Sequence, residues 1–510
     1  MLLYNSMTNK KEEFVPIIEK NVKIYACGPT VYNFFHIGNG RAFMVYDVLR
    51  RYLEFRGYEV TFVQNFTDID DKMIKRANEE GVTVKDIADR YIKEYYVDAD
   101  GLNCKRPTYQ PKATESIGAI IGIVKKLYDN GVAYVIEGDG VYYDVTKKED
   151  YGKLSHYNLD ELNAGGGERH ASFDGKRNPG DFALWKFKKE GEPAWNSPWG
   201  EGRPGWHIEC SAMIKKHLGD TIDIHGGGQD LIFPHHENEI AQSEAANGCT
   251  LANFWVHNAF VNVDGEKMSK SLGNFFTIRD IVAHFPYSVI RFFILSGHYR
   301  MPINFSDELL RASQTGLQRI STSVSNIKFA LENKGAANNS GEADEELNNA
   351  VKEAADSFIA HMDDDLNTAD AITDIYNLVK AANTALASFQ KKMGLQTGSA
   401  PGEEILSAGR IAQEKGIPFS LCDREISVTL KRAWGMSSAS DKIKLLTTLI
   451  SSAFSKEEIQ STLQKALSND LTHMSDLEKN LLDALENHSL TNLDAGWDKP
   501  ESGSELSASQ

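Results

Sequence analysis

The hydrophobic and polar positions near the start of the chain follow the pattern of a β-strand, then an α-helix, then a second strand. The run 22–27 has the composition of a buried strand, and apolar residues recur at helical spacing from about 38 to 56. A second β-like run follows at 59–65. This βαβ pattern predicts an open parallel sheet, which binds nucleotides at the carboxyl ends of its strands. We therefore expect residues 27–30 and 65–68 to face one cleft.

The pattern changes twice further along the chain. From about 117 to 204, short strand-like runs such as 133–136 and 141–145 alternate with Gly- and Pro-rich turns, which predicts an insertion of hairpins. The α/β pattern resumes at Gly205, and beyond Ser306 almost every segment has helical periodicity. The sequence thus predicts an interrupted α/β domain that is followed by helices.

Composition narrows the class of protein. A chain of 510 residues is long enough for about three or four domains. Its hydrophobic content of 41% is ordinary for a soluble protein, and no apolar run approaches the about 20 residues that span a bilayer. The five cysteines are odd in number and scattered, and the first residues lack the pattern of a signal peptide. We expect a cytoplasmic protein without a membrane partner.

The net charge of −17 bears on nucleic-acid partners. Indiscriminate binding to nucleic acid depends on a positively charged face. We therefore expect no role on DNA, and any RNA partner must be held by local basic patches.

Two short motifs, far apart in the chain, together indicate a split ATP site. His-Ile-Gly-Asn at 36–39 follows the first predicted strand, and Lys-Met-Ser-Lys-Ser stands at 267–271. Each motif alone is weak, because short strings with one Gly are common and Lys/Ser-rich loops are usually solvated turns. Their order and spacing favour one shared site.

A third group of residues is typical of a metal site. His235 and Glu239 are one helical turn apart and would project from the same face, and Cys27 and Cys210 are available to complete a tetrahedral zinc set. The pattern alone leaves a surface His–Glu pair and ordinary buried cysteines open as the alternative. His236 and Glu237 would point elsewhere and orient the ligands, with His207 and His225 as possible neighbours.

These motifs resemble those of the cysteinyl-tRNA synthetases, a family of class I aminoacyl-tRNA synthetases. The resemblance extends from about residue 4 to 306. It rests on six stretches of sequence: Cys-Gly-Pro-Thr-Val-Tyr (27–32), Asn-Phe-Thr-Asp-Ile-Asp-Asp-Lys (65–72), Gly-Trp-His-Ile-Glu-Cys-Ser-Ala-Met (205–213), Asp-Ile-His-Gly-Gly-Gly (223–228), His-His-Glu-Asn-Glu (235–239) and Lys-Met-Ser-Lys-Ser (267–271).

The resemblance implies an α/β fold with a Rossmann-like class I catalytic domain, an inserted connective domain and α-helical tRNA-binding domains. The expected division is a first catalytic half at 1–116, the connective insertion at 117–204, a second catalytic half at 205–260, the Lys-rich loop with a stem-contact helical region at 261–335, a helical tRNA-binding domain at 343–396, a divergent helical region at 404–500 and a disordered tail at 501–510.

The activity that the resemblance implies is ATP-dependent activation of L-cysteine, followed by transfer of the cysteinyl group to the 3′ end of tRNA(Cys). One zinc ion would hold the substrate as a thiolate, which the hydroxyl of serine cannot mimic. The insertion would then place the tRNA acceptor end rather than edit. By position, the implied zinc ligands are Cys27, Cys210, His235 and Glu239.

The resemblance also implies which residues bind ATP and the amino acid. The catalytic residues would be His36, Asn39, Lys267 and Lys270, which meet the charge that builds on the phosphates of ATP bound with Mg²⁺. Asn39 replaces the usual second histidine, and its amide can still donate a hydrogen bond to phosphate. Gly38 and Gly228 would complete the ATP site, and the amino-acid site would contain Gly28, Thr30, Thr67, Trp206 and Asp230, the last of which could instead meet the ATP ribose.

The resemblance fades after about residue 397, where the basic helices and the closing Gly-Thr-x-Trp segment of the family are missing. Two alternatives therefore stay beside the synthetase. One is a related cysteine ligase with a small amine acceptor, and the other is a noncatalytic tRNA-binding relative. The helical tRNA-binding domain argues against the ligase with a small amine acceptor. The retained lysines that would bind phosphate argue against the noncatalytic relative.

Overall fold

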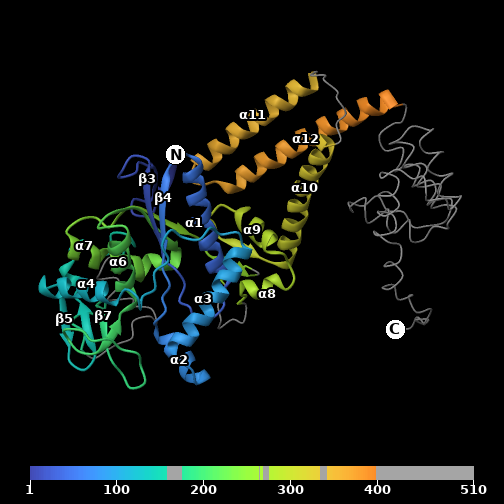
Figure 1. The fold of residues 1–510 in the computed structure, drawn as a ribbon. Helices are drawn as coiled ribbons and strands as arrows, with labels where there is room; N and C mark the ends of the chain where they lie inside the picture. The colour runs from blue at the N-terminus through green and yellow to red at the C-terminus, as the bar shows by residue number, and fades with distance from the viewer. Residues whose placement is uncertain (158–174, 264, 268–274, 333–341, 398–510) are drawn as a thin grey trace, which may run out of the picture. The chain divides into compact units, whose positions relative to one another are not determined.

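A computed structural model describes residues 1–157, 175–263, 265–267, 275–332 and 342–397 of the chain (Figure 1). The chain divides into two compact units, 1–383 and 384–510. The described elements lie in the first unit, apart from the end of the last helix. The predicted residues Lys270 and the whole of 404–510 lie outside the described residues.

Four parallel strands form the central sheet. β3 (Asn21–Ala26) pairs with β4 (Glu59–Gln64) on one side and with β9 (Ile222–Gly228) on the other, and β10 (Ala252–Asn258) pairs with β9. Helix α1 (Ile37–Phe55) connects β3 to β4. The predicted βαβ unit is confirmed, and its helix begins one residue earlier than expected.

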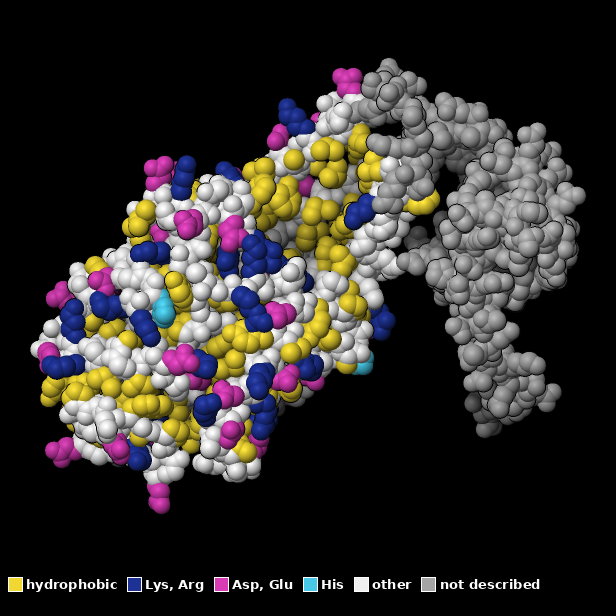
Figure 2. All heavy atoms as spheres, viewed as in Figure 1, with side chains coloured by type: hydrophobic (Ala, Val, Ile, Leu, Met, Phe, Trp, Pro, Cys, Tyr) yellow, Lys and Arg dark blue, Asp and Glu magenta, His cyan; other side chains and the backbone are white. Residues whose placement is uncertain are grey.

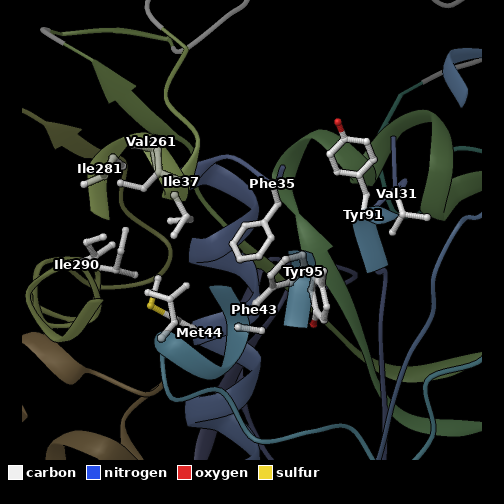
Figure 3. Packing of buried hydrophobic residues seen from close by; sticks show 14 of the residues in the cluster. Val31, Phe35, Ile37, Phe43, Met44, Tyr91, Tyr95, Val261, Ile281 and Ile290 are labelled. Atoms are coloured by element: carbon white, nitrogen blue, oxygen red, sulfur yellow. The ribbon is translucent and has the colours of Figure 1, made fainter. Parts of the chain in front are cut away.

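Helix α1 separates two parts of the hydrophobic core. Its buried side chains Phe43 and Met44 pack with residues of α3 (Val84–Gly101) in a cluster of aromatic rings that also includes Phe35 and Tyr95 (Figure 3). The ring centroids of Phe35 and Phe43 are 5.2 Å apart, and those of Phe43 and Tyr95 are 5.4 Å apart. This packing fixes the loop that leads into α1, because Phe35 directly precedes His36. Helix α2 (Asp71–Glu80) stands before α3.

The predicted insertion folds as an antiparallel sheet with its own helix. Helix α4 (Ile117–Asp129) comes first, and the four strands after it pair in the order β5-β6-β7-β8. These strands are β5 (Ala133–Ile136), β6 (Gly140–Tyr143), β7 (Phe182–Phe187) and β8 (Gly202–Pro204), with the short helix η1 (Val145–Lys147) between β6 and β7. Its hydrophobic core includes residues of two later helices, α6 (Trp206–His217) and α7 (Glu237–Asn247). In Figure 1, α4, α6 and α7 lie together against the β5–β7 strands. The insertion is therefore packed against the helices that follow it in the sequence.

The segment after β10 returns to the start of α1. The short strand β11 pairs with β12 and β13, and the backbone around Thr277 then pairs with His36. The amide of Ile37 donates to Phe276 O (3.1 Å), and the amide of Ile278 donates to Phe35 O (3.0 Å). The remaining elements of this part are β11 (Val261–Val263), β12 (Glu266–Lys267), α8 (Ile278–Val282), α9 (Tyr287–Leu295) and β13 (Ile303–Phe305).

Three long helices follow, as the periodicity beyond Ser306 predicts: α10 (Asp307–Glu332), α11 (Glu342–Asp363) and α12 (Thr368–Thr397). The turn between α11 and α12 is held by the buried carboxylate of Asp365. This carboxylate accepts hydrogen bonds from the amide of Tyr4 (2.8 Å), the hydroxyl of Tyr299 (2.6 Å) and the guanidinium of Arg300 (2.6 Å). The helical pair is thus attached to both the amino-terminal strand and the end of the α/β domain.

The amino-terminal hairpin is an element that the sequence did not predict. Strand β1 (Leu2–Asn5) pairs antiparallel with β2 (Lys10–Glu13). Each strand has only four residues and β2 is entirely charged, so neither has the apolar alternation of a half-buried strand. Long-range contacts stabilise the hairpin, such as the hydrogen bond from the side-chain amide of Asn5 to Asn253 O (3.0 Å).

Lysine and arginine side chains on the visible face are interspersed with aspartate and glutamate (Figure 2). Ion pairs at short range along a helix occur in the described part of the chain, such as Arg76 with Glu80 and Arg50 with Glu54. None of the described helices is long and apolar enough to cross a membrane.

Candidate metal and nucleotide site

The four predicted metal ligands converge from separate elements at one edge of the central sheet. Cys27 directly follows β3, Cys210 lies in the second turn of α6, and Glu239 lies in the first turn of α7. His235 stands in the kinked π-helical turn η3 (Ile232–His236) that leads into α7. Cys210, His235 and Glu239 are buried, and Cys27 is partly buried.

The distances between the ligand atoms suit a tetrahedral metal. Cys27 Sγ is 3.9 Å from Cys210 Sγ and 3.5 Å from Glu239 Oε1. His235 Nε2 is 3.6 Å from Cys210 Sγ and 2.9 Å from Glu239 Oε1. Zinc bonds of about 2.0–2.3 Å place adjacent ligand atoms about 3.3–3.8 Å apart in a tetrahedron. Sulfur, nitrogen and oxygen donors at this spacing are the donor set that zinc takes in proteins.

A second possible ligand set shares two of these residues. The ligand atoms of Cys27, His225, His236 and Glu239 also lie within 4.8 Å of one another. His236 Nε2 is 3.3 Å from Cys27 Sγ, so this imidazole does not point away as the helical spacing predicts. His236 has helical backbone angles (φ −69°, ψ −34°), so its approach to Cys27 depends on where the end of β3 lies relative to the start of α7.

Neighbouring histidines orient the carboxylate and the imidazoles, as expected for His225 and His207. His225 Nε2 lies 2.7 Å from Glu239 Oε2, and His207 Nδ1 lies 2.8 Å from His235 Nδ1. Burial alone would raise the pKa of Glu239, but the imidazoles of His225 and His235 outweigh it and lower this pKa to about 2. The hydrogen bond between the two thiols lowers the pKa of Cys210, whereas burial and the same hydrogen bond raise the pKa of Cys27. Glu239 and Cys210 are therefore predisposed to the anionic form that binds a metal.

The carboxylate of Glu237 is directed elsewhere than at the candidate ligands, as expected, and its partners lie in the insertion. This buried carboxylate accepts hydrogen bonds from three backbone amides of the insertion, those of Gly152 (2.9 Å), Leu154 (3.1 Å) and Ser155 (2.8 Å). It therefore contacts a loop that is about 80 residues away in the sequence, and no described hydrogen bond joins it to a candidate ligand.

The predicted amino-acid residues lie beside the metal ligands. Gly28 follows Cys27, and its amide donates to Asn65 Oδ1 (2.9 Å). The backbones of Thr30 and Thr67 pair with each other across the ends of the first two central strands. The ring of Trp206 is 43% exposed and lies 4.4 Å from the ring of His235 between centroids. Trp206 is therefore not a core residue.

The hydroxyl of Thr67 contacts Glu209, an acidic residue that was not among the predicted site residues. It donates to Glu209 Oε2 (2.8 Å), and Glu209 is only 1% exposed. Burial, together with the nearby Cys210, raises the pKa of Glu209 well above its usual range. Glu209 lies within the Gly-Trp-His-Ile-Glu-Cys stretch that carried the family resemblance. Its burial and its contact with Thr67 depend on the fold and could not be predicted from that stretch alone.

The predicted ATP residues gather at two places. His36 caps α1 through Nδ1, which accepts from the amide of Asn39 (3.3 Å), and Gly38 lies in the same turn. Gly228 ends β9 next to Asp230, which is exposed. The amides of Ile37 and Asn39 already donate to Phe276 O and His36 Nδ1, so it is the partial positive charge of the helix amino terminus that favours phosphate here.

The second motif of the split site is only partly described. The backbone of Lys267 lies in β12, and Lys270 lies outside the described residues. The residues that follow this motif pair with the backbone of His36 at Thr277. The first residue beyond the 268–274 gap, Phe275, also has its ring 5.1 Å from the ring of His36 between centroids.

Arg41 is a further residue near the ATP site that pattern reasoning missed. Its guanidinium is fully buried and donates to carbonyl oxygens of two loops, including Phe260 O (2.7 Å) and Met301 O (2.5 Å). Burial lowers its pKa to about 10. A single arginine on an amphipathic helix is ordinarily exposed, so no local signal marked it.

Comparisons with known proteins agree with these observations. A family model described as the catalytic domain of tRNA synthetases class I (C) matches residues 13–315, and a DALR domain model matches residues 357–400. A cysteine--tRNA ligase from Caldicellulosiruptor saccharolyticus is 55% identical over 392 residues, which cover 77% of this chain and 83% of that protein. The chain belongs to the cysteine--tRNA ligase family. A second cysteine--tRNA ligase, from Clostridioides difficile, is also 55% identical, over 75% of this chain and 82% of that protein.

Membership of the cysteine--tRNA ligase family confirms the resemblance that the motifs carried, and it agrees with the class I fold. A solved structure of Mycobacterium tuberculosis methionyl-tRNA synthetase in complex with methionyl-adenylate has a TM-score of 0.55 to this chain at 16% identity. The match covers 71% of this chain and 83% of that one. At this identity the likeness concerns the fold alone.

Proposed function

We propose that the chain is a cysteine--tRNA ligase, which activates L-cysteine with ATP and transfers it to tRNA(Cys) with release of pyrophosphate and AMP. The observation that carries the proposal is the convergence of two thiols, an imidazole and a carboxylate beside Trp206 at the carboxyl edge of the parallel sheet. Membership of the family supports the same activity. We propose a cytoplasmic location, because the four described cysteines are free thiols.

Zinc is the metal that best fits this donor set, with Cys27, Cys210, His235 and Glu239 as its ligands. A bound zinc ion would supply a strong preference for a thiolate over a hydroxyl. An apolar pocket alone separates such similar substrates by only about 10- to 200-fold. Trp206 would cover the bound amino acid, and Glu209 would orient the Thr67 hydroxyl toward it.

The residues at the amino terminus of α1 would hold the triphosphate. His36, Gly38 and Asn39 lie together at the amino terminus of α1, where the helix dipole favours a bound phosphate. Lys267 and Lys270 would meet the charge that develops on the phosphates, with Mg²⁺ bound to ATP. Asp230, next to Gly228, would accept a hydrogen bond from the substrate ammonium or the ribose.

The acceptor is tested by transfer of labelled cysteine to unfractionated tRNA with ATP and Mg²⁺, with serine as competitor. Charging that is selective for cysteine is the expected result. A chain that supports cysteine-dependent pyrophosphate exchange but no charging would instead be a ligase with a small amine acceptor. The DALR match favours tRNA over such an amine.

A further inference from the structure

Helix α7, which carries the candidate ligand Glu239, is held along most of its length by the insertion. The hydroxyl of Tyr143 donates to Ala241 O (3.2 Å), and the side-chain amide of Asn130 donates to Ala245 O (3.1 Å). Lys148 and Lys153 both pair with Glu244, at 2.8 and 2.6 Å. These contacts follow α7 turn by turn toward its carboxyl end, away from the ligands.

The contact of the insertion that lies nearest the candidate ligands is made by backbone amides to the carboxylate of Glu237. Residues 151–155 form a turn whose three amides, from Gly152, Leu154 and Ser155, converge on the single carboxylate of Glu237. None of the described ion pairs includes Glu237, so these backbone amides are the partners that the structure gives to its buried charge. Converging backbone amides of this type form a favourable site for an anion.

The same turn also packs under the metal cluster. Leu154 is 1% exposed and belongs to the hydrophobic cluster that contains Cys210 and Ile240, and Cys27 packs against that cluster. The hydroxyl of Tyr151 donates to Asn238 Oδ1 (2.5 Å). The turn therefore contacts two consecutive residues of the first turn of α7 and the core behind two of the ligands.

We infer that Glu237 is a positioning residue through which the insertion fixes the metal ligands, and hence the binding of cysteine. Glu237 lies two residues after His235 and two before Glu239, in one turn of the backbone. If the turn 151–155 did not hold Glu237, this backbone turn would lose the hydrogen bonds that anchor it to the insertion. The inference rests on the proposed function and adds to it that the insertion takes part in selecting the amino acid.

Two substitutions approach this contact from its two sides. Glu237→Gln replaces one acceptor oxygen with an NH₂ group that faces the backbone amides of the turn. Gly152→Ala changes only the insertion: Gly152 has φ +97°, and a Cβ there would lie 2.0 Å from Tyr157 O, so the turn must rearrange. The matched control is Glu244→Gln. Glu244 lies on the same helix as Glu237 but further from the candidate ligands, and the substitution removes the charge that pairs with two lysines of the insertion.

The assay is cysteine-dependent ATP–pyrophosphate exchange by the full-length zinc-loaded protein, together with the rate at which zinc is released to a chelator. For both Glu237→Gln and Gly152→Ala we expect the KM for cysteine to rise about 10- to 100-fold and zinc release to accelerate, with the KM for ATP within twofold of wild type. Glu244→Gln should leave both KM values within twofold.

Three results would overturn the inference. A cysteine KM within twofold of wild type in either substituted protein would remove the role of the contact. Equal rises in both KM values, or loss of the soluble protein in both, would mean that Glu237 only stabilises the fold. An effect of the same size in Glu244→Gln would mean that any loosening of the insertion suffices. A wild-type protein without cysteine-dependent exchange would instead refute the proposed function.

Discussion

Gly28 provides a direct test of the close approach between the backbone segments that follow β3 and β4. A Cβ at this position would lie 1.6 Å from the carbonyl oxygen of Asn65 and 2.7 Å from its carbonyl carbon. Both atoms belong to the backbone, so no side chain can turn aside. To restore a contact above about 3.0 Å, the two strand ends of Gly28→Ala must separate by more than about 1 Å.

This separation would displace the loop that carries Cys27 from the loop that carries Thr67, and it would stretch the bond from the Gly28 amide to Asn65 Oδ1. A misplacement of about 1 Å in a reacting site costs about 100-fold in rate, or about 2.7 kcal/mol. We therefore expect kcat/KM for cysteine in pyrophosphate exchange to fall by about this factor in Gly28→Ala.

The control for this experiment is Gly122→Ala. Gly122 lies in α4, and a Cβ there meets no atom within 4 Å. The same chemical change should leave exchange at the wild-type level and stabilise the helix by up to about 1 kcal/mol. An exchange rate within threefold of wild type for Gly28→Ala would refute the close approach of the two loops as a requirement for binding cysteine.

Three further substitutions test other parts of the site. Cys210→Ser should lower the zinc content measured by elemental analysis and reduce the discrimination between cysteine and serine; full retention of zinc would contradict the ligand set. The double substitution Lys267→Ala with Lys270→Ala should slow adenylate formation by more than about 100-fold at an unchanged melting temperature, and retained exchange would refute their role on the phosphates. Arg41→Met removes hydrogen bonds to five carbonyl oxygens, of which the oxygen of Met301 has no second donor among the described hydrogen bonds. We therefore expect the free energy of unfolding, measured in urea, to fall by about 2–4 kcal/mol. A fall of less than about 1 kcal/mol would show that the two loops keep their conformation without Arg41.

The sequence predicted the parts of the molecule that depend on local pattern. The strand before Cys27 and helix α1 follow from runs of apolar residues at regular spacing, and the bounds agree within one residue. The spacing of His235 and Glu239 also survives the kink at Phe233, since their ligand atoms lie 2.9 Å apart.

The parts that were missed depend on contacts between distant segments. His236 approaches Cys27 because of where the end of β3 lies relative to the start of α7, which the spacing of residues along the helix does not give. Glu237 has its partners about 80 residues earlier, and the burial of Arg41 is decided by loops more than 200 residues later. No periodicity within one segment carries such information.

The buried carboxylate of Asp365 has a consequence for how the chain can be shortened. The sequence places a natural cut after the α/β domain, near residue 335. A protein that ended there would lack the acceptor for the amide of Tyr4, the hydroxyl of Tyr299 and the guanidinium of Arg300. Unsatisfied donors of this kind cost about 1–3 kcal/mol each. The α/β domain alone would therefore be less stable than it is in the whole chain, and during synthesis its amino-terminal strand completes its hydrogen bonds only after the ribosome has added more than 360 further residues.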